Sequence, residues 1–207
     1  MSEVGRVWRS CDSSAIVWRI GAMAAGLALA LTACGGGVRM LATDDQRLPL
    51  EARRWVADAE DGVLVARAFR DRAAQRRADV LTRSRSLADE ADTLAGSGGG
   101  DAAERLRQVA DARVALANAE LRLAEAELAM SETRRAQINA ETAVQHDLAV
   151  YDLAPLKGAT EAALAQIRRQ RSELDRQRAE LEQLTSAWWE SYARFTAQSG
   201  RRDLLWR

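Results

Sequence analysis

Cysteine, histidine and lysine are scarce in this chain of 207 residues, which holds two cysteines, one histidine (His146) and one lysine (Lys157). A metal site with several histidine ligands cannot form, and a histidine-based triad or a Schiff base would depend on a single residue. Both cysteines lie near the N-terminus, so we expect no disulfide and no cysteine nucleophile in the body of the chain. His146 next to Asp147 could indicate a proton relay, but a lone histidine on a helix surface is usually only solvated. We therefore expect no catalytic residue, no metal site and no enzyme.

Proline, strand-forming residues and an excess of either charge are also lacking. The chain has 2 prolines, and its 30 basic residues are matched by 30 acidic ones. Alanine, leucine, arginine, glutamate and glutamine dominate, which favours helices and predicts an all-α fold. Nucleic-acid-binding proteins usually carry a basic excess on one face, and the basic stretch from Arg168 to Arg178 is interleaved with acidic residues. We expect no nucleic-acid partner.

A short apolar segment runs from Ile20 to Ala33 and is followed by Cys34 and three glycines. Its roughly 14 residues would make a helix of ~21 Å, shorter than the ~30 Å hydrocarbon core of a bilayer. This length is typical of the hydrophobic region of a signal peptide, and less suited to the alternative, an uncleaved membrane anchor.

The sequence Leu31-Thr32-Ala33-Cys34 resembles the lipobox of bacterial lipoprotein precursors. The resemblance implies cleavage between Ala33 and Cys34, a diacylglycerol on the Cys34 sulfur and an acyl chain such as palmitate on the new N-terminus. These covalent lipids are the only cofactors that we expect. Because Gly35 and not aspartate follows the cysteine, the resemblance also implies sorting to the periplasmic face of the outer membrane.

The segment before the apolar run is longer than is usual for that family. A start codon assigned too early would explain this length, and Val17 or Met23 would then lie nearer the true start. Whichever start is correct, we treat residues 1–33 as a signal peptide that takes no part in the fold.

Three long helices are predicted for the body, residues 50–200, at about 50–95, 101–152 and 159–198. Residues 34–49 are expected to form a lipidated tether, and residues 201–207 a tail. The glycine-rich stretch Gly96–Gly100 separates the first two helices, and Asp101 with Glu104 matches a capping box. Pro155 and Gly158 separate the second helix from the third.

The second helix carries the clearest heptad repeats, in two interleaved rows and a shorter third one. The rows are Val109, Leu116, Leu123, Met130, Gln137, Val144 and Tyr151; Ala112, Ala119, Ala126, Thr133, Ala140 and Asp147; and Leu121, Ala124, Leu128 and Ile138. Apolar rows on two sides predict a central helix with two neighbours. Short connections then give an elongated up-down-up antiparallel coiled coil. In the alternative arrangement, the third helix pairs with another copy of the chain.

The outer helices carry weaker predicted seams. In the first helix the seam comprises Trp55, Ala59, Gly62, Ala66, Phe69, Ala73, Val80, Leu87, Ala91 and Leu94. In the third it comprises Leu164, Ile167, Arg171, Leu174, Arg178, Leu181, Thr185, Trp188, Tyr192 and Phe195. Arginines in a seam can fix the register of a coiled coil, and we expect Arg171 and Arg178 to find partners near Gln137 and Glu132.

Aromatic residues gather near the C-terminus. Trp188, Tyr192 and Phe195 continue the predicted seam and are expected in the core, whereas Trp189 and Trp206 lie off it. Exposed aromatic residues often mark contact surfaces, so these two tryptophans are the candidate partner-binding residues.

The sequence thus predicts a non-enzymatic lipoprotein of the cell envelope, in which a coiled coil spaces or docks other components. Its partners are expected to be a membrane, through the lipid, and a protein or a second copy, through the coiled coil. A thin rod offers no deep pocket for a small-molecule substrate. The alternative is an accessory coiled-coil subunit of an export or efflux complex.

Overall fold

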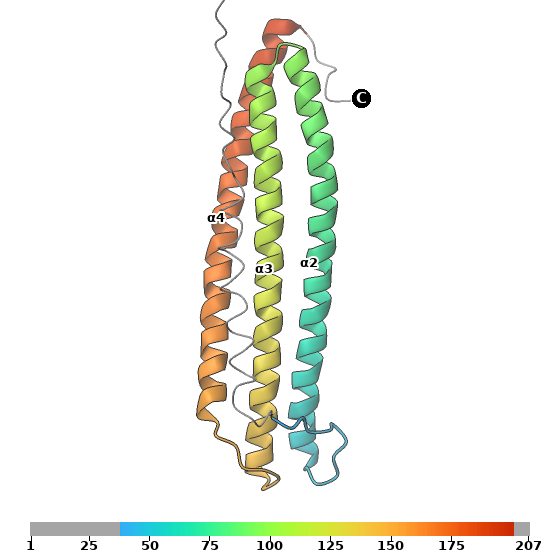
Figure 1. Cartoon of the computed structure of the whole chain (residues 1–207), viewed down its shortest axis with the longest axis vertical. Helices are drawn as coiled ribbons and strands as arrows, with labels where there is room; N and C mark the ends of the chain where they lie inside the picture. Colours follow the sequence, from blue (N-terminus) through green and yellow to red (C-terminus); the bar gives the residue numbers. More distant parts are fainter. Residues whose placement is uncertain (1–37, 201–207) are drawn as a thin grey trace, which may run out of the picture. The chain divides into compact units, whose positions relative to one another are not determined.

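The computed structural model describes residues 38–200 and contains three long α-helices: α2 (Leu50–Gly96), α3 (Gly100–Gln145) and α4 (Ala154–Ser199). They run alternately up, down and up beside one another (Figure 1), and the described range contains no strand. The predicted all-α antiparallel coiled coil is confirmed. With 46 residues, α3 is ~69 Å long at ~1.5 Å per residue.

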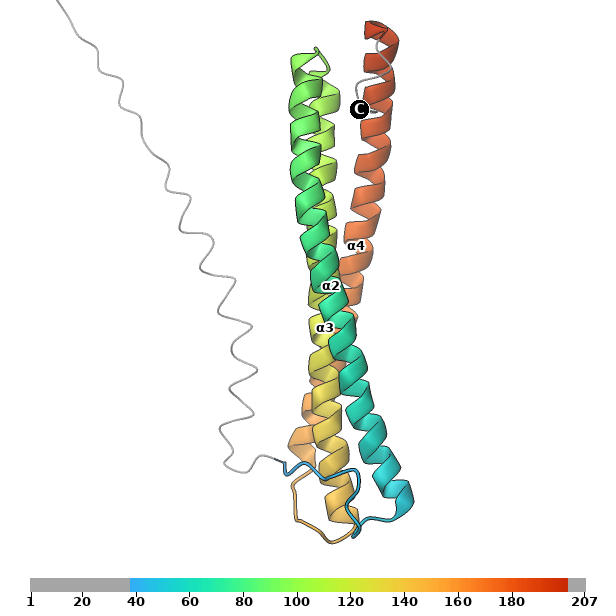
Figure 2. The same ribbon diagram turned by 90° about the vertical axis from the view of Figure 1, so that its right-hand side faces the viewer.

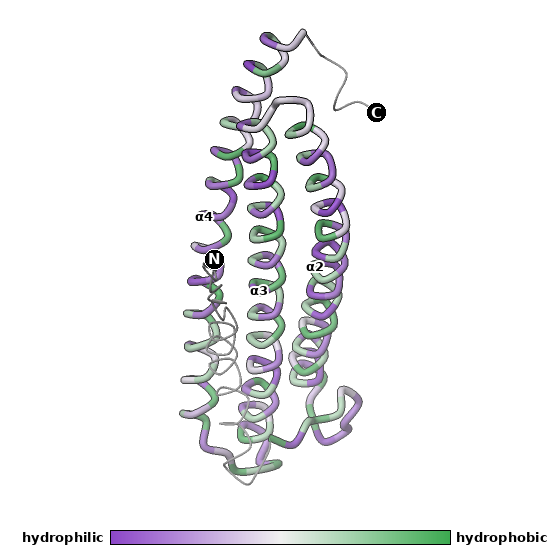
Figure 3. The backbone as a smooth tube through the Cα atoms, turned by 45° about the horizontal axis from the view of Figure 1, so that its top comes forward, coloured by the Kyte–Doolittle hydropathy of each residue, from purple (hydrophilic) through white to green (hydrophobic). Residues whose placement is uncertain are grey.

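Helix α3 is the central helix, as its two apolar rows predicted. It packs along both α2 and α4, whereas α2 and α4 barely touch each other. Figure 2 shows the two outer helices inclined in opposite directions across it. We call the end where α2 begins and α3 ends the base, and the end of the turn at Ser97–Gly99 the apex. Hydrophobic positions recur along all three helices between hydrophilic ones (Figure 3).

Small side chains fill much of the interface around α3. Its fully or nearly buried residues include Ala102, Ala103, Ala110, Ala112, Ala117, Ala119, Ala124, Ala140 and Ala143. Alanine lets the backbones of neighbouring helices approach closely, which explains how one helix can pack tightly against two others.

The seam of α2 differs from the predicted one at three positions in the first half of the helix, whereas the other predicted positions do lie in it. The seam consists of buried and half-buried residues at alternating spacings of three and four: Ala52, Val56, Ala59, Val63, Ala66, Arg70, Ala73, Arg77, Val80, Ser84, Leu87, Ala91 and Leu94. Val56 and Val63 turn inward, so Trp55, Gly62 and Phe69 are exposed. Their predicted place in the seam is wrong.

The seam of α4 also differs from the prediction. It contains Leu156, Thr160, Ala163, Ile167, Gln170, Leu174, Gln177, Leu181, Leu184, Trp188, Ser191 and Phe195. Gln170 and Gln177 take the positions assigned to Arg171 and Arg178, whose side chains are exposed. A neutral amide is cheaper to desolvate than a guanidinium, which explains the choice.

Two helix boundaries differ from the prediction, while α2 agrees with it. Helix α3 ends at Gln145, before the predicted 152, and Asp147 adopts a left-handed conformation in the following loop. Helix α4 begins at Ala154, before the predicted 159, with Pro155 in its first turn. Proline is tolerated there because the first amides of a helix have no partner within it.

The predicted capping box at the start of α3 does not form. Gly99 is the N-cap and makes no side-chain cap hydrogen bond. Asp101 lies within the first turn and pairs with Arg105 at 3.3 Å. A carboxylate in this turn still meets the positive end of the helix dipole.

The end of the predicted tether belongs to the folded unit. Leu41 and Leu48 are buried with Ala52, Val56 and Ala143 in a cluster at the base. The Leu41 amide donates a hydrogen bond of 2.7 Å to Oδ1 of Asn139 in α3. We call residues 41–48 the base strap, because they cross the ends of α2 and α3 before α2 begins.

Candidate functional site

The predicted lipidation and cleavage site, Ala33 and Cys34, lies outside the described residues, as does Trp206. Their predicted roles therefore remain predictions. Among the residues that the structure describes, three features bear on function: the aromatic group at the apex, the charged contacts of α4 and an open groove near the base.

The aromatic group closes the apex. Tyr192 and Phe195 are buried against Leu94 and Leu106 of the other two helices, and Trp188 packs on this cluster. We call it the apical cluster. The predicted core positions of the three α4 aromatic residues are confirmed.

Trp189 lies off the seam, as predicted, and its side chain is 50 % exposed. Its ring centroid is 4.4 Å from that of Trp188. The Trp188 indole nitrogen and the Tyr192 hydroxyl are buried without a hydrogen-bond partner. The apex thus combines one exposed aromatic surface with two unused polar groups directly beneath it.

Polar contacts tie α4 to the start of α3 at this end. A hydrogen bond from Ser191 is the main cause that lowers the pKa of Asp101; desolvation, the next largest cause, raises it, and Arg105 and Arg194 lower it further. Arg194 approaches Asp101 to 3.8 Å. The carboxylate therefore links two helices next to the apical cluster.

The two arginines predicted in the α4 seam make other contacts. Arg171 pairs with Glu127 of α3 at 3.2 Å, and Arg178 pairs with Asp175 of its own helix at 3.7 Å. The predicted partners are engaged elsewhere, since Glu132 pairs with Arg67 at 3.4 Å and Gln137 accepts from Thr160 at 2.7 Å. The predicted seam positions and partners of the two arginines are wrong, although Arg171 does pair with α3, and the Gln137–Thr160 hydrogen bond is a further link between α3 and α4.

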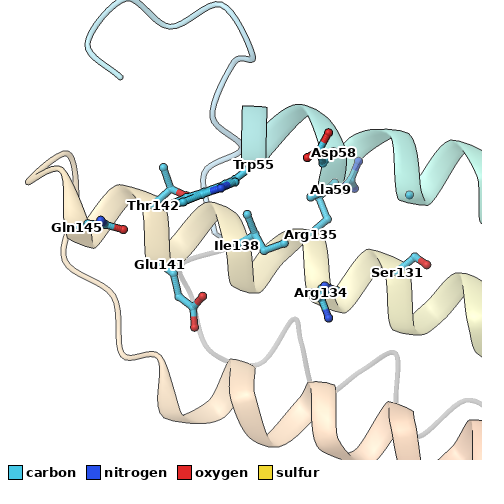
Figure 4. A pocket seen from close by; sticks show the side chains of 11 residues that line it. Trp55, Asp58, Ala59, Ser131, Arg134, Arg135, Ile138, Glu141, Thr142 and Gln145 are labelled. Carbon is cyan, nitrogen blue, oxygen red and sulfur yellow. The ribbon is translucent and has the colours of Figure 1, made fainter. Parts of the chain in front are cut away.

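An open groove runs along the side of the rod between α2 and α3, in the half nearer the base. Its hollow of about 490 Å³ is lined by Trp55, Asp58, Ala59, Gly62, Ser131, Arg134, Arg135, Ile138, Glu141, Thr142 and Gln145. Figure 4 shows the Trp55 ring lying across α3 next to Thr142, with Ile138 beside it. A second hollow, of about 330 Å³, shares Gly62 and Ser131 with the first, extends to Phe69, and is also lined by α4, which contributes Leu164. We call the two hollows together the lateral groove.

Three large apolar side chains are exposed along the lateral groove. The exposed fractions are 43 % for Trp55, 51 % for Phe69 and 40 % for Leu164. The sequence analysis missed this surface because it assigned all three residues to seams. The signal was present as a pair of adjacent apolar rows on α2, with Val56 and Val63 beside the row of Trp55, Gly62 and Phe69.

Charged groups without partners lie on both edges of the groove. Within residues 38–200, neither Asp58 nor Arg134 forms an ion pair, and Nε of Arg135 is buried without a hydrogen-bond partner. In Figure 4 the Asp58 carboxylate lies at α2, and Arg134 extends from the side of α3 that faces away from α2. The groove thus has one unpaired carboxylate at α2 and one unpaired guanidinium group at α3, at the same height along the rod.

His146 caps the C-terminal end of α3 and is half-buried. No group of three or more potential metal ligands occurs within the described range. None of the helices in this range is both long enough and apolar enough to cross a bilayer. Comparisons with protein families, with curated proteins and with solved structures find no match to this chain.

Proposed function

We propose that this protein is a lipid-anchored, non-enzymatic lipoprotein of the cell envelope, whose coiled coil holds a docking surface at a distance from the membrane. The observation that carries the anchor is the lipobox-like sequence Leu31-Thr32-Ala33-Cys34, and the base strap supports the link between that anchor and the coiled coil. The chain that follows Cys34 enters the folded unit at Met40 and is fixed to α3 by the Leu41–Asn139 hydrogen bond.

The base strap determines how such an anchor would act. Between Cys34 and Met40 lie few residues, which span at most ~22 Å at ~3.6 Å per residue. A lipid on Cys34 would therefore keep the base close to the bilayer. The apex would stand up to ~70 Å farther away if the rod is upright, because the helices are nearly straight and continuous.

The surfaces of the rod suit contacts with proteins. The lateral groove is open along its whole length, whereas small-molecule sites are usually concave and enclose most of their ligand. Trp189 offers an aromatic contact surface at the apex. The proposal accordingly includes a protein partner or a second copy, and neither a nucleic acid nor a small-molecule substrate.

Lipidation is tested by metabolic labelling with radioactive palmitate in a bacterial host. We expect label in the wild-type chain, none in Cys34→Ser, and unchanged label in Cys11→Ser, the matched control. Separation of inner and outer membranes then tests the outer-membrane destination. Equal labelling of wild type and Cys34→Ser would refute the anchor.

The docking role is tested by crosslinking in intact cells followed by pull-down, with Trp189→Ala and Trp206→Ala compared with wild type. Loss of a crosslinked partner in either variant is expected if the apex docks it. Identical partner sets in all three strains would refute the aromatic contact. Co-purification with an envelope channel would favour the alternative, an accessory subunit of an export or efflux complex.

A further inference from the structure

We propose that the lateral groove is filled by the lateral groove of a second copy of this chain, in a parallel dimer with its two-fold axis along the rod. The α2–α3 pairs of the two copies then form a four-helix section near the base. That the occupant is a second copy follows from the groove itself. The parallel orientation rests on the proposed function, because both copies must reach the same membrane.

The helix directions favour this arrangement. In a four-helix section around such an axis, α2 of one copy lies against α3 of the other, and the two α2 helices are diagonal to each other. Every neighbouring pair is then antiparallel, as α2 and α3 already are within one chain. A four-helix bundle usually consists of helices that are antiparallel to their neighbours and surround an apolar core.

The shape of the groove also fits its own copy. The small side chains of Ala59 and Ser131, and Gly62 without one, leave empty space at the centre of the groove. A Cβ atom added at Gly62 would meet no atom within 4 Å. Small residues at the centre let two copies approach closely. At the ends of the groove, Trp55 and Phe69 would then be covered, where each is now about half exposed.

The charges of the groove complement each other under this symmetry. Asp58 and Arg134 lie on opposite edges at the same height (Figure 4), and neither forms an ion pair within residues 38–200. A two-fold rotation about the rod direction exchanges the two edges. It brings Asp58 of each copy to Arg134 of the other, so that two unpaired carboxylates meet two unpaired guanidinium groups. Complementary charges of this kind fix the register and exclude wrong partners.

Thiol crosslinking in membranes tests the position of the second copy. The full-length chain carries Cys11→Ser and either Gly62→Cys, inside the groove, or Leu64→Cys, which is exposed on another face of α2 and serves as the matched control. A short bismaleimide is added, and bands are identified by mass spectrometry in cells that express tagged and untagged copies.

We expect Gly62→Cys to give a band that contains only this chain, tagged and untagged, and Leu64→Cys to give none. Gln145→Cys, at the base end of the groove, should also give the dimer, because only parallel copies bring their base ends together. A dimer through Gly62→Cys without one through Gln145→Cys would overturn the parallel orientation. No band, an equal band from Leu64→Cys, or a band with a different protein would overturn the second copy as occupant.

Charge reversal tests the proposed pairing in the Gly62→Cys background. Asp58→Arg alone and Arg134→Asp alone should each reduce the dimer band about tenfold or more, because like charges then face each other twice in each dimer. The double variant should restore it, which also shows that the exchanged residues allow folding. A double variant no better than the single ones would refute the pairing. The palmitate labelling of Cys34 is scored separately, so failure of the anchor and failure of the dimer are distinguishable.

Discussion

The base strap makes a quantitative prediction about one buried amide, Asn139. Its side chain is fully buried, accepts from the Leu41 amide at 2.7 Å and donates to the Arg135 carbonyl at 2.8 Å. Replacing it by alanine leaves the Leu41 amide buried without an acceptor. We expect Asn139→Ala to lower the free energy of unfolding and to release the base strap.

The magnitude follows from three contributions. A buried amide without a partner costs about 1–3 kcal/mol. The hydrogen bond to the Arg135 carbonyl contributes little, since that carbonyl keeps its helical partner. Alanine recovers roughly 0.5 kcal/mol because it favours helix more than asparagine does. The net loss is about 1.5 kcal/mol, which corresponds to a fall in Tm of roughly 3–6 °C for a domain of this size.

Urea unfolding followed by circular dichroism measures the loss. The matched control is Asn118→Ala, which is the same substitution in the same helix. Asn118 is only half-buried, and it accepts from Arg77, which can turn to solvent instead. The control should cost less than about 1 kcal/mol. Hydrogen exchange at the Leu41 amide should accelerate in Asn139→Ala alone. Equal effects of the two substitutions, or a loss below about 0.5 kcal/mol for Asn139→Ala, would refute the reasoning.

Three further predictions concern the apex and the α4 seam. Gly99→Ala should destabilise the fold by about 1–2 kcal/mol in urea unfolding, because the new methyl group would lie 3.0–3.1 Å from side chains of the apical cluster, while Gly100→Ala, with open space around it, should not. Folding lowers the pKa of Asp101, so the folded state binds fewer protons than the unfolded state, and stability should fall as the pH drops through the ordinary aspartate range near ~4. Unfolding curves between pH 6 and 3 should show a smaller fall for Asp101→Asn, and an unchanged fall would argue against this linkage. Arg171→Leu should change the free energy of unfolding by less than about 0.5 kcal/mol in urea unfolding, because the arginine is exposed. Gln170→Leu, in the seam, should raise the free energy of unfolding by roughly 1 kcal/mol. A larger gain from Arg171→Leu than from Gln170→Leu would contradict the observed register.

The central helix could be predicted from the sequence because its heptad rows are long and alanine-rich. The registers of the outer helices could not, for a physical reason. In α2, Trp55 and Val56 each begin a row of residues spaced seven apart. Which row packs into the seam depends on the surface of α3. In α4, the seam prefers Gln170 to Arg171 because an amide is easier to desolvate than a guanidinium. Periodicity alone does not contain that preference.

The base strap was missed for a different reason. Its polar composition, with two aspartates, resembles a linker, and its two leucines stand only at its ends. Both leucines are buried against α2 and α3, and the Leu41 amide bonds to Asn139, 98 residues away along the chain. A contact of this separation leaves no local pattern. The lateral groove was missed because each of its exposed apolar residues also suited a seam.

The base strap has a mechanical consequence for an anchored rod. A pull on the proposed lipid would be transmitted through the base strap, where the hydrogen bond from the Leu41 amide to Asn139 in α3 would oppose it. Helix α2 would be shielded from the pull by the buried side chain of Leu48. Tension would therefore reach α3 through Asn139 before it reaches α2. A rod attached directly through the first turn of α2 would instead be peeled open from its end.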